Sequence, residues 1–421
     1  MKRYATYALP LALAACSGSG STPGEIQSAK QRETAPSVSS AQLTAAATGE
    51  RAFGVDLYGQ LAKAAPGNLF FSPHSIDEAL SMTYVGAAGA TATQMRAALA
   101  FTLPDDQLHQ AMNGLDLALE SRGKGQTGVD GSPFKLSVAN ALWGQDGYTF
   151  LPAFLDTIAE SYGAGVHPLD FVHAPEPSRV TINDWVAKET SNKILDLIPQ
   201  GGVTSDTRLV LTNAVYFNAS WAKAFEASAT TDASFTLADG STVQAPTMHG
   251  GFEGAGFSDV SMQAVQLDYA GNELSMVVIQ PKDLAAFESS LSPDRLDAII
   301  ARLAPAYVTL SLPKWKVTDT HSLSKPLQQL GMTDAFESAA DFSGMDGAKD
   351  FIIQDVLHKA YIAVDEKGTE AAAATAVVVV GTTSIESNQL SLSFDHPYLY
   401  LIRDNATGAV VFMGRISNPT K

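Results

Sequence analysis

Residues 366–385 read EKGTEAAAATAVVVVGTTSI, an alanine-rich half joined to a valine-rich half with no charge after Glu370. Alanine favours helix and valine favours strand, so the stretch carries preferences for two conformations. One interpretation is a helix end that runs into a strand. As a single strand, the stretch would place only small, uncharged side chains on one face, because alternate residues point to opposite faces. That face holds Thr369, Ala371, Ala373, Thr375 and Val377.

The same stretch is suited to entering an existing sheet. A charge on the inward face would be costly to bury, and none is present there. The opposite face carries Glu370 followed by alanines at 372, 374 and 376. Gly368 at the base supplies a hinge with a free φ angle. We therefore expect a segment that can change from an exposed loop to an inserted strand.

Length and composition limit the number of domains and the classes of partner that the chain can have. The chain has 421 residues, of which 45% are hydrophobic and 17% charged, with a net charge of −17. This length allows one large domain or two ordinary ones with a sizeable core. An acidic chain repels phosphate backbones, so we expect no nucleic-acid partner. No run of about eighteen apolar residues occurs, so no helix is expected to span a membrane.

The N-terminus has the pattern of an export signal. Lys2 and Arg3 precede an apolar stretch at 4–15, as in a secretory signal peptide. This stretch runs into Leu13-Ala14-Ala15-Cys16, which resembles the lipobox of bacterial lipoproteins, in which the cysteine is acylated. The other interpretation is an ordinary signal peptide with a chance cysteine, although Cys16 is the only cysteine in the chain. The lipoprotein interpretation predicts a signal peptide at 1–15, lipidation of Cys16, and export to the cell envelope. Ser17 favours an outer-membrane anchor, with an extracellular location as the alternative.

Beyond the signal, the chain divides into a tether and a folded domain. Residues 16–48 are rich in small and polar residues with little apolar periodicity, which predicts a flexible tether. Residues 49–421 predict one α+β domain, with helices mostly first and strands mostly later. We expect helices near 51–65, 75–86, 90–100, 105–120, 150–162, 178–197 and 321–331, with Ser75 as N-cap of the second. We expect strands near 69–71, 208–217, 262–269, 273–280, 306–312, 351–365, 390–394, 398–404 and 409–415, the strand at 208–217 being buried on both faces.

The motifs of common catalytic sites are absent from the sequence. There is no GxSxG elbow, HExxH, P-loop or GxGxxG. A single cysteine excludes cysteine-based metal sites, and the eight histidines are scattered. Only His167 and His173 approach metal-ligand spacing, and a polar loop explains that pair better. We therefore expect no enzyme activity, no metal and no cofactor.

Five further stretches match the pattern of a known family in the right order. They are Asn68-Leu69-Phe70-Phe71-Ser72-Pro73-His74-Ser75, Thr212-Asn213-Ala214-Val215-Tyr216-Phe217, Leu312-Pro313-Lys314, Asp395-His396-Pro397-Tyr398 and Phe412-Met413-Gly414-Arg415. Together with 366–375, they resemble the serpins, a family of serine protease inhibitors, over about residues 50–420. One departure is Asn218-Ala219, where the family usually has Lys-Gly, and we expect little functional consequence from it.

The resemblance implies a fold and a mechanism. The serpin fold has a large central β-sheet, additional sheets, about eight or nine helices and an exposed reactive-centre loop. A target serine protease attacks this loop and forms an acyl-enzyme. Before water releases the protease, the loop inserts into the central sheet and distorts the trapped active site. Such an inhibitor acts as a monomer, forms a covalent acyl complex, and has a metastable fold held by a kinetic barrier.

The resemblance also assigns roles to residues. The hinge of the loop comprises Glu366, Gly368, Thr369, Glu370, Ala371, Ala372, Ala373, Ala374 and Thr375. The shutter, where the sheet opens, should involve Ser72, Ser75, Asn213 and His358, whose polar groups can form a switchable hydrogen-bond network. Trp221 should lie near the top of the sheet, where insertion starts, and Glu366 should pair with Lys314. Without the resemblance, each shutter residue is equally well interpreted as a polar core residue whose hydrogen bonds are satisfied and which has no functional role.

The protease is expected to cut Thr382-Thr383, about fourteen residues beyond Gly368. Counting back from Pro397 instead gives Glu386, because this loop is about four residues longer than a common family length. The small residues at 379–382 suit elastase-like or subtilisin-like proteases and disfavour trypsin-like ones. The alternative is a non-inhibitory serpin acting as a binding module. Such members often carry bulky, charged or proline residues in the hinge, and this chain has none of them on the inward face.

Overall fold

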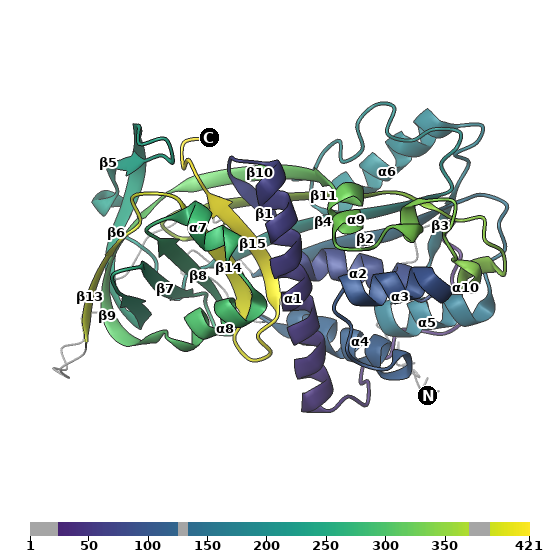
Figure 1. The fold of residues 1–421 in the computed structure, drawn as a ribbon, viewed down its shortest axis with the longest axis horizontal. Coiled ribbons are helices and arrows are strands. Elements are labelled where there is room, and N and C mark those ends of the chain that lie inside the picture. Colours follow the sequence, from purple (N-terminus) through teal and green to yellow (C-terminus); the bar gives the residue numbers. More distant parts are fainter. Residues whose placement is uncertain (1–23, 125–133, 370–387) are drawn as a thin grey trace, which may run out of the picture.

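The computed structural model describes residues 24–124, 134–369 and 388–421. Within these ranges, ten α-helices pack against two β-sheets (Figure 1). The helices are α1 (Ser40–Ala64), α2 (Pro73–Tyr84), α3 (Gly89–Ala98), α4 (Asp105–Ser121), α5 (Pro152–Tyr162), α6 (Pro175–Glu189), α7 (Leu284–Ser289), α8 (Pro293–Ala301), α9 (Ser324–Gln329) and α10 (Ser343–Asp346). Three of them, α7, α9 and α10, have six residues or fewer, so the seven longer helices dominate the packing.

A six-stranded sheet forms the centre of the molecule. Its strands, in spatial order, are β10 (Trp315–Ser322), β11 (Ile353–Val364), β12 (Gly368–Thr369), β4 (Leu209–Ser220), β2 (Lys135–Gln145) and β3 (Val166–Leu169). The strand expected at 208–217 is β4, and its residues are buried almost throughout. Successive side chains of β4 enter two separate cores, because Leu209 and Leu211 pack on one face and Val210 and Ala214 on the other. The predicted burial on both faces is thus confirmed.

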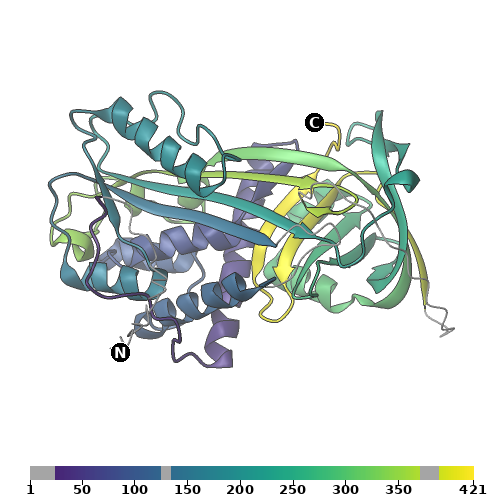
Figure 2. The ribbon, with the colours of Figure 1, turned by 180° about the vertical axis from the view of Figure 1, so that it is seen from behind.

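Helices cover the two faces of this sheet unequally. Helices α2 to α5 lie beneath it with α1 crossing beside them, whereas α6 lies on the opposite face (Figures 1 and 2). The larger core fills the first interface, and the smaller core under α6 includes Trp143, Ile182 and Val186. Helix α2 packs directly on β2 and β4. One face of the six-stranded sheet therefore packs on α2.

The second sheet has nine strands and lies at the other end of the molecule (Figure 1). In spatial order they are β1 (Leu69–Phe71), β15 (Val410–Ile416), β14 (Tyr398–Asp404), β8 (Leu274–Pro281), β7 (Met262–Asp268), β6 (Thr242–Ser258), β9 (Ala304–Pro313) and β13 (Gln389–Ser393), with β5 (Thr231–Thr236) paired to β6. Strand β6 was not predicted, because its four glycines lower β-propensity. Its pairing with β5, β7 and β9 supplies the stability that its own sequence lacks.

Several predicted elements differ at their ends. The N-cap of α2 is Ser72, not Ser75, because Ser72 accepts from the Ser75 amide and Pro73 occupies the first turn. Helix α6 ends at Glu189 rather than 197, and Ser191 and Asn192 then adopt positive φ angles. The expected helix at 321–331 is the end of β10 followed by the short α9. His167, expected on a loop, lies in β3 and stacks on Trp143.

The folded part of the chain begins earlier than the predicted boundary at residue 49. Helix α1 starts at Ser40, where Ser39 and Gln42 form a capping box. Before it, Ile26 pairs with Val166 of β3, and Arg32 binds Asn113 and carboxylates of α4. Residues 24–48, expected in the tether, thus lie against the domain through polar contacts of Arg32 and through scattered apolar residues such as Ile26, Val38 and Leu43. Among the described residues, no helix combines the length and apolar character needed to cross a membrane.

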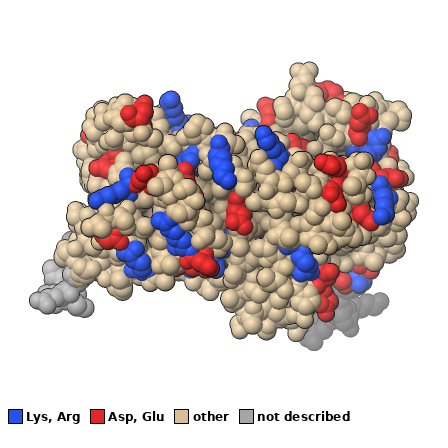
Figure 3. All heavy atoms as spheres, viewed as in Figure 1, with Lys and Arg blue, Asp and Glu red and all other residues tan. Residues whose placement is uncertain are grey.

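One face of the described surface mixes both signs of charge. On the face shown in Figure 3, Lys and Arg side chains lie between Asp and Glu side chains over both ends of the molecule. The described residues on that face therefore form no continuous basic patch, despite the presence of 27 Lys and Arg in the chain.

Candidate functional site

The hinge begins as a short strand inside the six-stranded sheet. Strand β12 lies between β11 and β4, with Gly368 opposite Ser220, and Thr369 opposite both Ala219 and Val364. Farther along, β11 and β4 pair directly with each other in parallel register, up to Tyr361 opposite Tyr216. Strand β12 therefore fills the place where the two parallel strands no longer contact each other.

Gly368 is required by its close approach to β4. A Cβ atom on this residue would lie 2.1 Å from the carbonyl oxygen of Ala219 and 2.7 Å from the Cα of Ser220. Both atoms belong to the backbone and cannot move aside without disturbing the sheet. The absence of a side chain thus allows the chain to enter the gap between β11 and β4.

Thr369 is fully buried, and its hydroxyl group contacts a tyrosine beneath the sheet. Its hydroxyl lies 2.7 Å from the hydroxyl of Tyr269, whose ring stacks on Trp221 at a centroid distance of 4.7 Å. Burial raises the pKa of Tyr269, so its hydroxyl stays protonated and can donate. The inward face predicted for Thr369 is therefore the face that the structure buries.

Glu366 is anchored beside the entrance to the gap. Its carboxylate accepts hydrogen bonds from Lys314 Nζ at 2.7 Å and from Thr230 Oγ1 at 2.7 Å. Burial alone would raise the pKa of Glu366, but the hydrogen bonds from Lys314 and Thr230 outweigh it and lower the pKa. Trp221 Nε1 donates to the carbonyl of Asp365 at 2.9 Å. These contacts hold Asp365 and Glu366 in place beside the gap between β11 and β4.

The shutter residues form one buried network under the middle of the sheet. The amide of Ser72 donates to His358 Nε2 at 3.2 Å, and His358 Nδ1 donates to Asn213 Oδ1. Asn213 Nδ2 in turn donates to Ser75 Oγ and, at 2.6 Å, to Asn140 Oδ1. The network therefore links α2, β11, β4 and β2 through a continuous series of hydrogen bonds.

This geometry fixes the protonation of His358. One ring nitrogen accepts from a backbone amide and the other donates to Asn213, so the ring is neutral with its proton on Nδ1. Burial, and then the neighbouring His321 ring at 6.4 Å, lower the pKa of His358 well below its usual value. The neutral ring of His358 thus accepts from Ser72 at the start of α2 and donates to Asn213 on β4.

The network lies on a single line across the sheet. His321 opposes His358, His358 opposes Asn213, and Asn213 opposes Asn140, on the four strands β10, β11, β4 and β2. The bond between His358 and Asn213 crosses the parallel junction of β11 and β4. Opening the sheet for a new strand would have to break this bond.

The predicted site residues thus fall into two described groups. The structure brings together Ser72, Ser75, Asn213 and His358 in the shutter, and Trp221, Lys314, Glu366, Gly368 and Thr369 at the entrance to the gap. Cys16, the hinge residues 370–375, and Thr382 and Thr383 lie outside the described residues.

Three participants were missed by sequence reasoning. Asn140 belongs to β2, a strand whose pattern does not alternate cleanly, so nothing marked it as a partner of Asn213. Thr230 and Tyr269 lie in and beside turns that bring them to the hinge only in the folded chain. A prediction of β2 and of its antiparallel register with β4 would have identified Asn140.

Comparisons with known proteins match one family over nearly the whole chain. A family model described as Serpin (serine protease inhibitor) matches residues 48–419. The leukocyte elastase inhibitor of Bos taurus is 37% identical over 397 residues, covering 90% of this chain and 100% of that protein. An uncharacterised serpin-like protein of Thermococcus kodakarensis is 38% identical over 370 residues, covering 87% of this chain and 84% of that protein. Uncleaved ovalbumin has a similar structure, with a TM-score of 0.78 and 26% identity, covering 89% of this chain and 100% of that one.

Proposed function

The chain belongs to the serpin family and has the serpin fold, and from this premise we propose that it inhibits serine proteases by suicide-substrate loop insertion. Serpins are protease inhibitors rather than catalytic enzymes, and relatives of this chain are named as inhibitors of leukocyte elastase. The target protease would attack the loop, and its serine would form an ester with the carbonyl of the residue before the cut. Insertion of the loop would then compete with hydrolysis of that ester.

The observation that carries the proposal is the position of β12. Its two residues already lie between β11 and β4, antiparallel to β4 and to β11. Each further residue that entered would replace part of a parallel pairing with two antiparallel pairings. Antiparallel pairing is slightly more stable per residue, so insertion is favourable once the sheet opens.

The register of β12 predicts where the rest of the hinge would go. Continued in the same register, Thr375 would oppose both Asn213 on β4 and His358 on β11. Its side chain would point inward, as that of Thr369 does, because the two residues are an even number apart. The Thr375 hydroxyl could then bond to the groups that now hold the shutter closed. Insertion would thus exchange one set of shutter bonds for another.

The same register limits the length of the inserted strand. Strand β4 has 12 residues, Leu209–Ser220, and its last partner would be Val379. A strand of this length spans about 40 Å, the distance over which a tethered protease would be carried. A cut at Thr382-Thr383 would lie just beyond the end of β4 and leave the protease at the far edge of the sheet.

The sequence before the proposed cut suggests the class of target. Val379-Val380-Gly381-Thr382 offers small, uncharged side chains, and no basic residue occurs between Gly368 and Ile385. Elastase-like and subtilisin-like proteases have pockets for such residues, whereas trypsin-like proteases need a basic one. The name of the Bos taurus relative points in the same direction. A non-inhibitory binding role is the second candidate, and the small inward side chains of the hinge speak against it.

A protease assay tests the proposal. The purified protein is mixed with pancreatic-type elastase, with subtilisin and, as control, with trypsin, and the products are analysed by denaturing gels and intact mass. We expect complexes with the first two enzymes that survive detergent, together with a released peptide beginning at Thr383. An elastase whose catalytic serine is replaced should give no complex. Cleavage by all of these active proteases without any complex would favour the non-inhibitory role.

We also propose that the inhibitor is exported and anchored by lipid on Cys16, at the outer membrane of a bacterial cell envelope. The signal-like stretch at 1–15 and the position of the only cysteine support this. Fractionation tests it: the wild-type chain is expected with membranes, and Cys16→Ser in the soluble fraction. Equal distribution of the two would contradict the anchor.

A further inference from the structure

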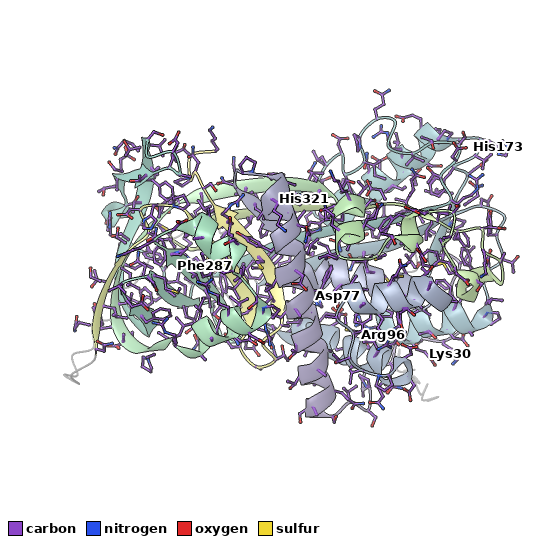
Figure 4. The ribbon with its side chains drawn as sticks, viewed as in Figure 1. Lys30, Asp77, Arg96, His173, Phe287 and His321 are labelled. Carbon is purple, nitrogen blue, oxygen red and sulfur yellow. The ribbon has the colours of Figure 1, made fainter. Side chains whose placement is uncertain are left out.

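Four carboxylates and a histidine are buried together beneath the six-stranded sheet. Glu50 of α1, His74, Asp77 and Glu78 of α2, and Asp116 of α4 each have less than a tenth of their surface exposed. Asp77, labelled in Figure 4, lies where α2 passes α1. Burying so many carboxylates is costly unless a counter-charge is present. The residues that the structure describes contribute one permanent cation in direct contact with this group, Arg32, which pairs with Asp116.

His74 is oriented in an unusual way within this group. Its Nδ1 lies 2.8 Å from Glu50 Oε2, which fixes the plane of the ring. Its Nε2 is buried without a hydrogen-bond partner and points toward Asp116 Oδ1, 3.4 Å away. Glu78 lies one helical turn after His74, so both side chains project from the same face of α2. Ligand atoms of His74, Glu78 and Asp116 all lie within 4.8 Å of one another.

We propose that His74, Glu78 and Asp116 bind a divalent metal ion of the zinc class. Bonds of about 2.1 Å at a tetrahedral angle place two ligand atoms about 3.4 Å apart, which matches the distance from His74 Nε2 to Asp116 Oδ1. The hydrogen bond that His74 Nδ1 donates to the Glu50 carboxylate is the arrangement that orients metal-binding histidines in proteins. A set of one imidazole and two carboxylates suits zinc better than magnesium or calcium, which prefer oxygen ligands alone.

The other two ligands are oriented as well. Glu78 Oε2 accepts from Asn140 Nδ2 at 2.7 Å, and Asp116 accepts from Arg32. Since Asn140 also belongs to the shutter, a metal ion on Glu78 would be one residue removed from the bond that links β4 to β2. The proposed site is distinct from the hinge and from the loop that meets the protease, so it adds a ligand to the fold rather than a step to inhibition.

An ion could reach this site from solvent. Glu78 and Asp116 line a cavity of about 760 Å³ between α4 and β2, which also contacts Arg32, Asn140 and Tyr162. A water molecule from this cavity could occupy the fourth position on the metal, opposite the three side chains. Metal sites with three protein ligands and one water are common for zinc.

Zinc titration of the metal-stripped protein tests the proposal. The full-length chain carries Cys16→Ser, so that its only thiol cannot bind metal, and Zn²⁺ is added in a calorimeter and in competition with a chromophoric chelator. We expect one Zn²⁺ per chain. His74→Gln and Glu78→Gln should each weaken binding at least about 100-fold, and Glu50→Gln about 10–100-fold, because Glu50 acts through the imidazole.

A matched control and a second measurement keep the outcome clear. His173→Gln removes an exposed histidine that also contacts an aspartate, Asp170, and should leave Zn²⁺ affinity unchanged. Anomalous scattering at the zinc edge from wild-type crystals would locate the ion even if a variant failed to fold. Absence of stoichiometric Zn²⁺ from the wild-type protein would overturn the site, and would indicate that a protonated His74 bridges Glu50 and Asp116 instead. An ion located elsewhere, or affinity unaffected by His74→Gln, would overturn it equally.

Discussion

Thr369→Arg is expected to convert the protein from an inhibitor into a substrate. Thr369 is fully buried between β11 and β4, where its hydroxyl meets that of Tyr269. An arginine there would place an unpaired charge in the core, at a cost of several kcal/mol. The hinge would then stay out of the sheet. A cost of about 3 kcal/mol on the insertion barrier slows insertion more than about 100-fold, so hydrolysis of the acyl-enzyme would win.

The measurement is the number of inhibitor molecules consumed for each protease molecule trapped. We expect a value near one for the wild-type chain and at least about tenfold higher for Thr369→Arg, since a 1.4 kcal/mol change in relative barrier already shifts the partition tenfold. Thr369→Ser keeps the hydroxyl and the small volume and should behave as wild type. Circular dichroism of all three proteins checks that the fold is retained. Full trapping by the arginine variant would show that insertion does not begin at β12.

Asn213→Leu is expected to destabilise the native sheet more than other polar-to-apolar changes on the same strand. Leucine keeps the branching of asparagine at Cγ but is larger, and it leaves His358 Nδ1, Ser75 Oγ and Asn140 Oδ1 without their Asn213 partner. Ser75 Oγ and Asn140 Oδ1 keep the hydrogen bond between them, so only His358 Nδ1 is left without a partner. A buried polar group left unpaired costs about 1–3 kcal/mol and each of the two other lost hydrogen bonds about 0.5–1.5 kcal/mol, so the total loss should be about 2–6 kcal/mol. Because the lost bond to His358 joins β4 to β11, the barrier to opening the sheet should fall as well.

Two readouts separate these effects. Thermal unfolding should show a lower midpoint for Asn213→Leu, and incubation at elevated temperature should show loss of inhibitory activity that is about tenfold faster or more. The control is Asn218→Leu on the same strand. The side-chain oxygen of Asn218 is buried without a hydrogen-bond partner, so its removal should cost little. Equal destabilisation by the two leucines would mean that the shutter bonds contribute nothing specific.

Helical periodicity and apolar runs were enough to predict those helices and strands that have a clear pattern in their own sequence. Strand β4 is an apolar run buried on both faces, and α4 and α5 have clear helical spacing, so each was predicted close to its observed position. Strand β6 and residues 24–39 were not predicted. The first is stabilised by neighbouring strands, and the second by contacts such as that of Arg32 with α4, which leave no local pattern.

The residues of the candidate site could be predicted from the sequence only in part, and by two different routes. The hinge could be read from its side chains, because small residues on one face are a local property. The shutter residues came from family resemblance, since Ser72, Asn213 and His358 are distant in sequence and meet only through the register of β4 and β11. The buried group around His74 escaped notice because the search considered histidine pairs, whereas the signal is a histidine and a glutamate one helical turn apart on α2.

The pairing of Ile26 with Val166 would give the molecule a direction if Cys16 carries the proposed lipid. Val166 on β3 lies opposite Leu142 of β2, which lies opposite Leu211, so the N-terminal segment leaves from the end of the sheet that is remote from β12. Between Cys16 and Gly24 the chain can reach at most about 29 Å. If the lipid holds, the bait would point away from the bilayer before capture. Insertion would then carry the captured enzyme along the length of the sheet toward the membrane that holds the lipid.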